Sequence, residues 1–324
     1  MALRVSIREQ GAGQGTFLCT ASALFSLAQR IYANTGERTG VMKPRYIPTL
    51  FRVLAALALH QHQAWAQAEV TSRLHAEADS LEQQGAYRVA LALTRQALSH
   101  SPNDAHLLYD VGRLLLRSGF PDSAVVALEQ SILVDSTSAT AWSDYGASLA
   151  MLDRLPEARE SFRAAYALDR SDALIVINLA RTEMALGEPA RGLDLVRTFR
   201  WDAADPSATF RAAELLLEGG HYSAALALYA LLSTRLPQLA HGHLRRGDVL
   251  IRLGRFTEAI DALELVTQLR PDLPEGWGAL GYALYSAGQS DAARVSWTTA
   301  VRLDANYFSV RHPEWQSHWE VVKE

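Results

Sequence analysis

The side chains of this 324-residue chain that could catalyse a reaction or bind a metal do not form a known reactive pattern. The sequence has no Gly-rich phosphate loop, no nucleophile elbow, no H-E-x-x-H helix and no C-x-x-C-H haem attachment motif. His241 and His243 are two positions apart, which places them on different sides of a helix and disfavours a shared metal ion. We therefore expect no catalytic residue, no cofactor and no metal site.

The acidic side chains have structural explanations as well. Glu157 and Glu160 fall at the start of an expected helix, where negative charge complements the positive end of the helix dipole. The helical pattern described next leaves no room for a separate catalytic domain. We expect that the protein is not an enzyme.

The elements that position these side chains are indicated by a small residue that returns every 33 or 34 positions. These anchor residues are Ala90, Ala124, Ala158, Gly192, Ala225, Ala259 and Ala293. A second small residue precedes each anchor by 12 positions, in the series Ala78, Gly112, Gly146, Ala180, Ala213, Gly247 and Gly281. A turn residue precedes each anchor by five positions, in the series Gly85, Gly119, Asp153, Gly187, Gly220, Gly254 and Gly288. This period predicts an array of helix pairs.

The residue types fit that prediction physically. Side chains at a helix crossing set the distance between the two axes, so small residues are needed where helices approach most closely. Glycine between the helices adopts backbone angles that end the first helix and begin a tight turn. Larger residues such as Leu128, Phe162 and Trp297 in the second helices fill the gaps around the small ones.

Residues 71–307 resemble seven tetratricopeptide repeats. The clearest copies are AWSDYGASLAMLDRLPEARESFRAAYALD (Ala141–Asp169) and GWGALGYALYSAGQSDAARVSWTTAVRLD (Gly276–Asp304). The resemblance implies an all-α fold, namely a right-handed α-solenoid of seven tetratricopeptide-type helix pairs with a C-terminal capping helix. We place the array at residues 67–307 and the capping segment at residues 308–324.

Repeat four departs most from this family pattern. Glu183 replaces an expected apolar residue, and Phe199 stands in a slot that is small in repeats one, two, three and seven. The repeat is also one residue short, in the stretch FRWDAADPS. We expect a local kink there.

The region before the array has the order of a secretory signal peptide, which we place at residues 42–66. Lys43, Arg45 and Arg52 form a basic start, an apolar run covers Val53–Leu59, and Ala64–Ala66 is an A-x-A cleavage pattern. Cleavage after Ala66 would make Gln67 the mature N-terminus.

Two interpretations of this region stay open. In one, translation begins at Met42 and residues 1–41, which carry no repeat, are not made. In the other, residues 1–66 are made as written and remain as an N-terminal anchor or lead. Residues 17–28 are apolar over only a dozen positions, too short for a membrane span of about 20 residues.

Charge divides the chain at the same place. Residues 1–66 hold seven basic and two acidic residues, which leaves 24 basic and 33 acidic residues in the remainder. An acidic repeat domain repels phosphate backbones, so we expect no nucleic-acid partner. The repeat domain has no cysteine, so an exported form would depend on its core rather than on disulfides.

The family resemblance also implies a binding surface on the first helix of each repeat. The positions that match the family's groove slots in repeats four to seven form a largely apolar and aromatic series with charges between. These candidate partner-binding residues are Ile177, Arg181, Met184, Phe210, Glu214, Leu217, Leu244, Asp248, Ile251, Tyr282 and Tyr285. Exposed apolar patches of this kind are typical of interaction sites. The alternative at each position is a side chain that packs on the neighbouring first helix.

Two further features bear on the partner. Family members that clamp a terminal carboxylate use basic and amide residues in the first groove, where this chain has His75 and Asp79, so that class of partner is disfavoured. Trp315 and Trp319 are four positions apart on one face of an expected C-terminal helix. We interpret this helix as a cap on repeat seven, with a docking peptide as the alternative.

The sequence therefore favours a non-catalytic scaffold or adaptor, exported to the periplasm or secreted, that binds a partner protein or peptide in its groove. The alternative is an accessory or assembly subunit of a membrane-bound complex, anchored at the outer face of the membrane by residues 1–66.

Overall fold

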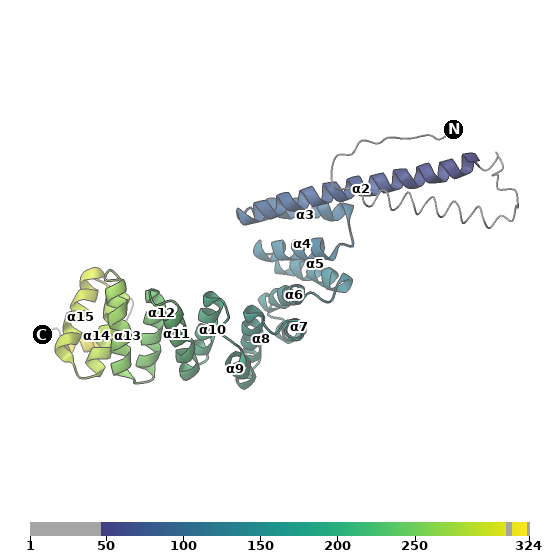
Figure 1. The fold of residues 1–324 in the computed structure, drawn as a ribbon. Helices are drawn as coiled ribbons and strands as arrows, with labels where there is room; N and C mark the ends of the chain where they lie inside the picture. Colours follow the sequence, from purple (N-terminus) through teal and green to yellow (C-terminus); the bar gives the residue numbers. More distant parts are fainter. Residues whose placement is uncertain (1–46, 309–312, 323–324) are drawn as a thin grey trace.

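The computed structural model describes residues 47–308 and 313–322, and the regular elements in these residues are all helices (Figure 1). In chain order the helices are α2 (Ile47–Gln83), α3 (Tyr87–His100), α4 (Ala105–Arg117), α5 (Pro121–Val134), α6 (Ala139–Met151), α7 (Leu155–Leu168), α8 (Ala173–Ala185), α9 (Pro189–Thr198), α10 (Pro206–Glu218), α11 (Tyr222–Arg235), α12 (Ala240–Arg252), α13 (Phe256–Leu269), α14 (Pro274–Ser286), α15 (Ser290–Leu303) and α16 (Pro313–Val322). The unassigned lead (residues 1–41) and the basic start at Lys43 and Arg45 lie outside the described residues.

The helices from α2 to α15 form seven antiparallel pairs stacked in chain order, followed by α16. Each helix packs against the next one in sequence except at α9 and α10, where α10 packs mainly on α8. First helices of other neighbouring repeats also touch, as α4 does with α6 and α12 with α14. Figure 1 shows the pairs side by side along an extended, curved array, with α2 and α3 at one end and α14 and α15 at the other. The predicted all-α solenoid is confirmed.

The seven predicted turn residues are the residues with positive φ in the described chain. The φ values are 77° at Gly85, 82° at Gly119, 60° at Asp153, 82° at Gly187, 76° at Gly220, 70° at Gly254 and 80° at Gly288. The backbone N–H of the next residue then bonds to a carbonyl in the last turn of the first helix, as Phe120 N does to Leu115 O at 3.0 Å. This closure ends each first helix and reverses the chain.

The small residues of the first helices lie where two helices cross closely. A Cβ atom on Gly281 would come within 2.3 Å of the Trp297 ring, and one on Gly146 within 2.9 Å of the Phe162 ring. Gly112 faces Leu128 in the same way. Each large side chain of a second helix thus fills the space left by a small residue of its own first helix.

Repeat four is irregular at the end of its second helix. Helix α9 has 10 residues, whereas the second helices of the other repeats have 14. Phe199 follows the end of α9 and packs on Trp201, with ring centroids 4.6 Å apart. The Trp201 indole nitrogen donates to the carbonyl of Val196 at 2.7 Å, and Arg235 donates to the carbonyl of Ala204 at 2.7 Å. These contacts replace the last turn of a regular second helix.

Glu183 is buried at 2% exposure in α8. Arg163 of α7 donates to its Oε1 atom at 2.8 Å, so the carboxylate is paired. The other carboxylate oxygen, Oε2, is buried without a hydrogen-bond partner. Repeat four therefore has a buried charge with only part of its hydrogen-bonding capacity used, where the family pattern has an apolar residue.

Helix α2 is 37 residues long and extends well beyond α3 (Figure 1). Among the described side chains the first buried one is Ala78, whereas Leu57, Leu59 and Trp65 are exposed. The predicted cleavage point after Ala66 lies within this helix. Among the described residues, no helix combines the length and apolarity that a membrane crossing requires.

Candidate partner-binding wall

The surface that gathers the predicted binding residues is made by the first helices α2, α4, α6, α8, α10, α12 and α14, and we call it the first-helix wall. Nine of the eleven candidates are at least partly exposed on it. Ile177 (0% exposed) and Leu244 (8% exposed) are buried in the core clusters of their repeats. At these two positions the structure has the alternative that the sequence left open, a side chain that packs inside the array.

Charged candidates near the middle of the wall are held by ion pairs. Arg245 of α12 donates from Nε and Nη2 to the two oxygens of Glu214 at 3.1 Å and 2.6 Å, and its Nη1 lies 3.7 Å from Asp248. The hydroxyl of buried Tyr229 also donates to Glu214. Burial and this hydrogen bond raise the pKa of Tyr229, so it remains a donor at neutral pH. The network ties α10, α11 and α12 together.

Phe210 lies beside this network and is partly exposed. Its ring centroid lies 5.8 Å from that of Tyr229 and 5.2 Å from that of His241. His241 is exposed, whereas His243 is buried with its Nε2 3.0 Å from the carbonyl of Pro237. The two histidines thus lie on different sides of α12, as their spacing predicts.

The last pair of candidates is covered by α16. The Trp315 ring stacks on Tyr282 with centroids 4.9 Å apart and planes 19° apart. His318 meets the rings of both Tyr282 and Tyr285, with centroids at 5.9 Å and 5.2 Å. Trp319 stacks on Phe308 at 5.6 Å. The C-terminal helix therefore packs on repeat seven through one aromatic face, and part of that face lies on the wall itself.

The opposite end of the wall is polar. Arg113 of α4 donates to Asp110 at 2.9 Å and to Glu82 of α2, and Arg117 lies 3.1 Å from Glu82. Farther along, burial and the carboxylate of Asp144 raise the pKa of Tyr109 to about 12. These interactions join the first helices of repeats one to three.

Three donor atoms come together at this end that the sequence did not lead us to expect. Nε2 of His75 lies 2.7 Å from Oδ2 of Asp110, and Nδ1 of His106 lies 3.1 Å from the same oxygen. His106 and Asp110 are four positions apart on α4, a spacing visible in the sequence. His75 comes from α2, so only the register between the two helices brings it to the pair.

Of the two carboxylates of α7 that were expected at the helix start, Glu157 lies in the first turn and Glu160 lies beyond it. Arg154 donates to both oxygens of Glu157 at 2.8 Å and 2.6 Å, and this pairing lowers the pKa of Glu157. Glu160 pairs with Arg159 and Arg163 on the same exposed helix.

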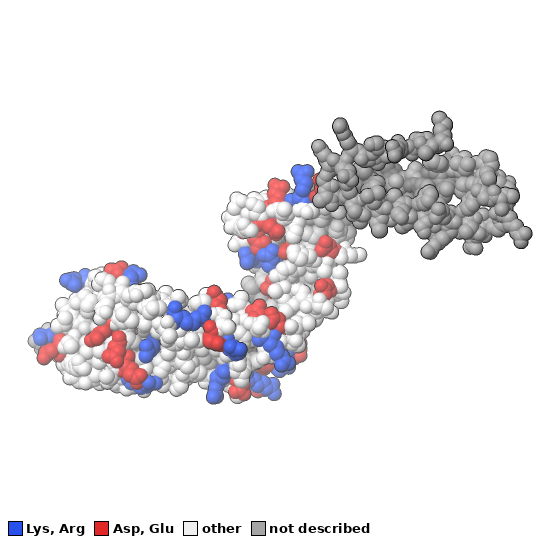
Figure 2. Space-filling view, in the orientation of Figure 1, with Lys and Arg blue, Asp and Glu red and all other residues white. Residues whose placement is uncertain are grey.

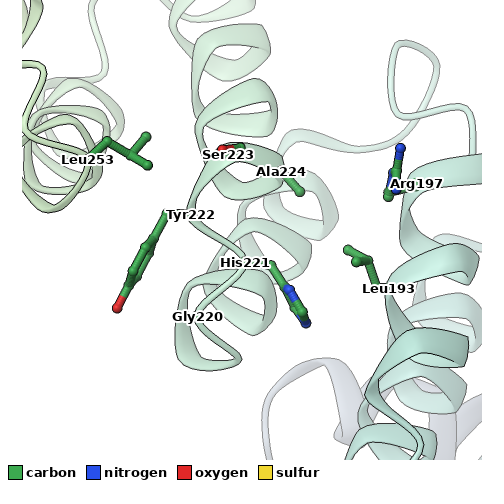
Figure 3. A pocket seen from close by; sticks show the side chains of 8 residues that line it. All are labelled: Leu193, Arg197, Gly220, His221, Tyr222, Ser223, Ala224 and Leu253. Atoms are coloured by element: carbon green, nitrogen blue, oxygen red, sulfur yellow. The ribbon is translucent and has the colours of Figure 1, made fainter.

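A shallow cavity of about 560 Å³ lies between α9 and the turn that precedes α11. In Figure 3, Leu193 and Arg197 of α9 face His221 across the opening, while Tyr222 points away from them. None of the predicted binding residues lines it.

Charge on the described surface is mixed. On the face drawn in Figure 2, basic and acidic side chains lie close together in small groups, and the described part of that face carries no broad basic area.

A family model described as "Tetratricopeptide repeat" matches residues 75–136, 109–173, 210–274 and 244–308. The matches cover more than half of the chain and omit residues 174–209, which hold the irregular fourth repeat. No curated protein matches the sequence.

Solved structures share the arrangement. The C-terminal part of a tetratricopeptide repeat-containing protein from Cytophaga hutchinsonii is 15% identical with a TM-score of 0.58, over 71% of this chain and 95% of that one. PilF from Pseudomonas aeruginosa is 20% identical with a TM-score of 0.51, over 65% of this chain and 96% of that one. At these identities the similarity shows the fold alone.

Proposed function

Because the chain belongs to the tetratricopeptide repeat family, whose members bind other proteins or peptides, we propose that it is a non-catalytic scaffold or adaptor that binds a partner along the first-helix wall. The proposed contact residues are the partly exposed candidates of repeats four to six, with Phe210, Leu217 and Ile251 as the apolar centre. Arg181, Met184, Glu214 and Asp248 surround them.

The observation that carries the proposal is the packing of α16. An aromatic helix from the same chain already lies on the wall at Tyr282 and Tyr285. This supports the view that side chains in the wall slots can hold a helix with apolar anchors. Toward repeat four, Met184, Leu217 and Ile251 pack against the core clusters but keep part of their side chains exposed to a segment from another protein.

Site-specific photo-crosslinking in the native cell tests this proposal. A photoreactive phenylalanine analogue replaces Phe210 or, separately, Ile251, and the matched control replaces Leu133, which is 80% exposed on the second helix α5. We expect one crosslinked protein at the two wall positions and none at the control position. Equal crosslinking at Leu133, or none at either wall position, would refute a binding wall.

The captured protein then allows a quantitative test. Removing a well-packed apolar anchor from an interface commonly costs about 2 kcal/mol, which is about 30-fold in affinity. Phe210→Ala should therefore weaken binding of the purified partner by about 30-fold, and Leu133→Ala should leave it unchanged. Circular dichroism of Phe210→Ala checks that the helices persist.

We further propose that the scaffold acts outside the cytoplasm, in the periplasm or secreted, after cleavage behind Ala66. The order of basic start, apolar run and A-x-A pattern supports export. The burial pattern of α2 is consistent with cleavage, because removal of residues up to Ala66 would take no buried side chain from the array among those described.

N-terminal sequencing of the protein from fractionated native cells tests the location. Gln67 at the N-terminus of a periplasmic or secreted species is the expected result. An uncut chain in the membrane fraction would instead favour an anchored accessory subunit, and an uncut chain in the cytoplasm would overturn export altogether.

A further inference from the structure

The polar end of the first-helix wall holds a group of possible metal ligands that lies apart from the proposed partner-binding residues. We propose that His75, His106 and Asp110 form a binding site for a divalent transition-metal ion, with Zn²⁺ as the expected ion. The site joins α2 of the first repeat to α4 of the second.

The donor atoms have the separations that such a site needs. Nε2 of His75, Nδ1 of His106 and Oδ2 of Asp110 all lie within 4.8 Å of one another. Donors around a tetrahedral zinc ion, at about 2.1 Å from the metal, are about 3.4 Å apart. The distances from His75 Nε2 and His106 Nδ1 to Asp110 Oδ2, 2.7 Å and 3.1 Å, reach that value after small side-chain rotations.

The chemistry of the donors agrees with the choice of ion. Two imidazoles and one carboxylate suit Zn²⁺, whereas Mg²⁺ and Ca²⁺ prefer oxygen ligands alone. A fourth ligand is within reach, because Oδ1 of half-exposed Asp79 lies 3.7 Å from Nε2 of His75. Beside the histidines lies an open cavity of about 460 Å³, large enough for a water molecule to take that place instead.

The surroundings hold the carboxylate in position. Arg113 donates to Oδ1 of Asp110 at 2.9 Å, which turns Oδ2 toward the two histidines, and outer contacts of this kind orient metal ligands. The positive charge of Arg113 opposes a nearby cation. Glu82 offsets that charge by pairing with the same guanidinium group, and Asp79 adds a further negative charge at the site.

The two histidines differ in exposure in a way that suits a site loaded from solvent. The side chain of His106 is 69% exposed and that of His75 25%, whereas the side chain of Asp110 is 5% exposed. The buried carboxylate would anchor the ion while the exposed imidazole closes over it. All three residues follow Gln67, so the site is retained whether or not the chain is cut after Ala66.

Isothermal titration calorimetry tests the site with ZnCl₂ and full-length protein treated with a chelator. The wild type should bind one equivalent of Zn²⁺. His75→Gln and His106→Gln should each weaken the affinity for Zn²⁺ by more than about tenfold. The matched control is His241→Gln, which removes an exposed histidine from α12 and should leave the affinity unchanged. His106 is exposed, so its replacement does not disturb the core, and circular dichroism verifies this for both variants.

A second measurement separates a built site from adventitious zinc binding. Zinc should slow amide hydrogen exchange in α2 and α4 around the three residues of the wild type, and it should not do so in His106→Gln. Absence of saturable binding, or equal affinities for the wild type and both site variants, overturns the proposal. Protection spread evenly over the array would do the same.

Discussion

At the scale of single residues, the turn inside each repeat depends on one backbone conformation with positive φ. Six of the seven positions are glycine, and a Cβ atom built on any of the six meets nothing within 4 Å. The preference for glycine there comes from the backbone angles and not from crowding. Asp153, at φ 60°, is the exception among the described residues.

We expect Gly119→Ala to lower the free energy of unfolding by about 1–2 kcal/mol, because an L-residue in the left-handed region carries that cost. Gly119→Asn should lose less, since asparagine tolerates the conformation better. Asp153→Gly should raise stability by a smaller amount than Gly119→Ala lowers it. Urea denaturation measures all three, and equal losses for the Ala and Asn variants would show that the backbone angle is not the cause.

Asp144 makes stability depend on pH. Burial, opposed by a Tyr109 hydrogen bond and by Arg113, raises the pKa of its carboxyl, so the folded protein holds this proton more tightly than the unfolded chain does. The resulting stabilisation is complete below the unfolded pKa and is lost as pH rises through the folded pKa. Ionised Asp144 is therefore unfavourable at neutral pH.

Asp144→Asn should thus raise the melting temperature at about pH 7, and the gain should vanish well below the ordinary carboxyl pKa of about 3.9. Asp135→Asn is the matched control with the opposite sign, because hydrogen bonds from Thr137 lower the pKa of exposed Asp135. That variant should be less stable than wild type at neutral pH and equal to it in acid. A pH-independent difference for Asp144→Asn would contradict the assignment.

Sequence alone predicts residues of this kind when their role is local. The turn positions follow from seven aligned slots, because a positive φ is a property of one residue and its neighbours. The His75, His106 and Asp110 cluster does not follow, because it depends on how far α2 is shifted along α4. Burial of Ile177 and Leu244 likewise depends on neighbouring helices, although their slots match exposed ones elsewhere.

At the scale of helices, the crossing within each repeat is set by a small residue facing a large one. Ala158 of α7 is fully buried, and Phe162 one turn later fills the space beside Gly146. The second helix therefore has no room for extra volume at its anchor position.

Ala158→Leu should overpack this crossing and lower the free energy of unfolding by about 1–3 kcal/mol. Ala167→Leu is the matched control, because Ala167 is an exposed residue of the same helix and its replacement should change stability little. Thermal melting of both variants checks the result. Similar melting temperatures for the two would mean that the crossing can spread to admit the larger side chain.

At the scale of the whole molecule, stability is a sum over repeats and the contacts between them, so a weak repeat is a local feature of the array. Helix α9 has two buried residues, Gly192 and Val196, whereas α13 has six. It is also four residues shorter. Repeat four should be the place where the array opens most readily.

Amide hydrogen exchange should therefore be faster in α9 than in α5 or α13, because local opening exposes amides at a cost below that of global unfolding. Mass spectrometry of peptic fragments measures this directly. Glu183→Leu, which restores an apolar residue at the partly satisfied buried charge, should slow exchange in α8 and α9 relative to wild type. Uniform exchange along the array would show that repeat four is no weaker than the rest.

The repeat number and the helix pairing were predictable because one period runs through residues 71–307. Phe199 in a small slot indicated that the end of repeat four is irregular. The sequence did not predict the contacts that replace the last turn of α9, which join Trp201 to Val196 and Arg235 to Ala204. Nor did the Trp315 and Trp319 spacing reveal that α16 reaches Tyr282 and Tyr285. Such contacts join segments whose separation no period fixes.

The N-terminal part of helix α2 projects beyond the repeat array. An α-helix rises about 1.5 Å per residue, so the 24 residues from Ile47 to Val70 reach about 36 Å beyond the first repeat. Held at its far end, this rod would keep the array at a set distance from the attachment point and limit the orientations that the wall can take. Cut after Ala66, the array would lose most of that reach and diffuse freely. The proposed cleavage at one peptide bond would therefore decide whether the wall diffuses freely or stays at a set distance from an attachment point.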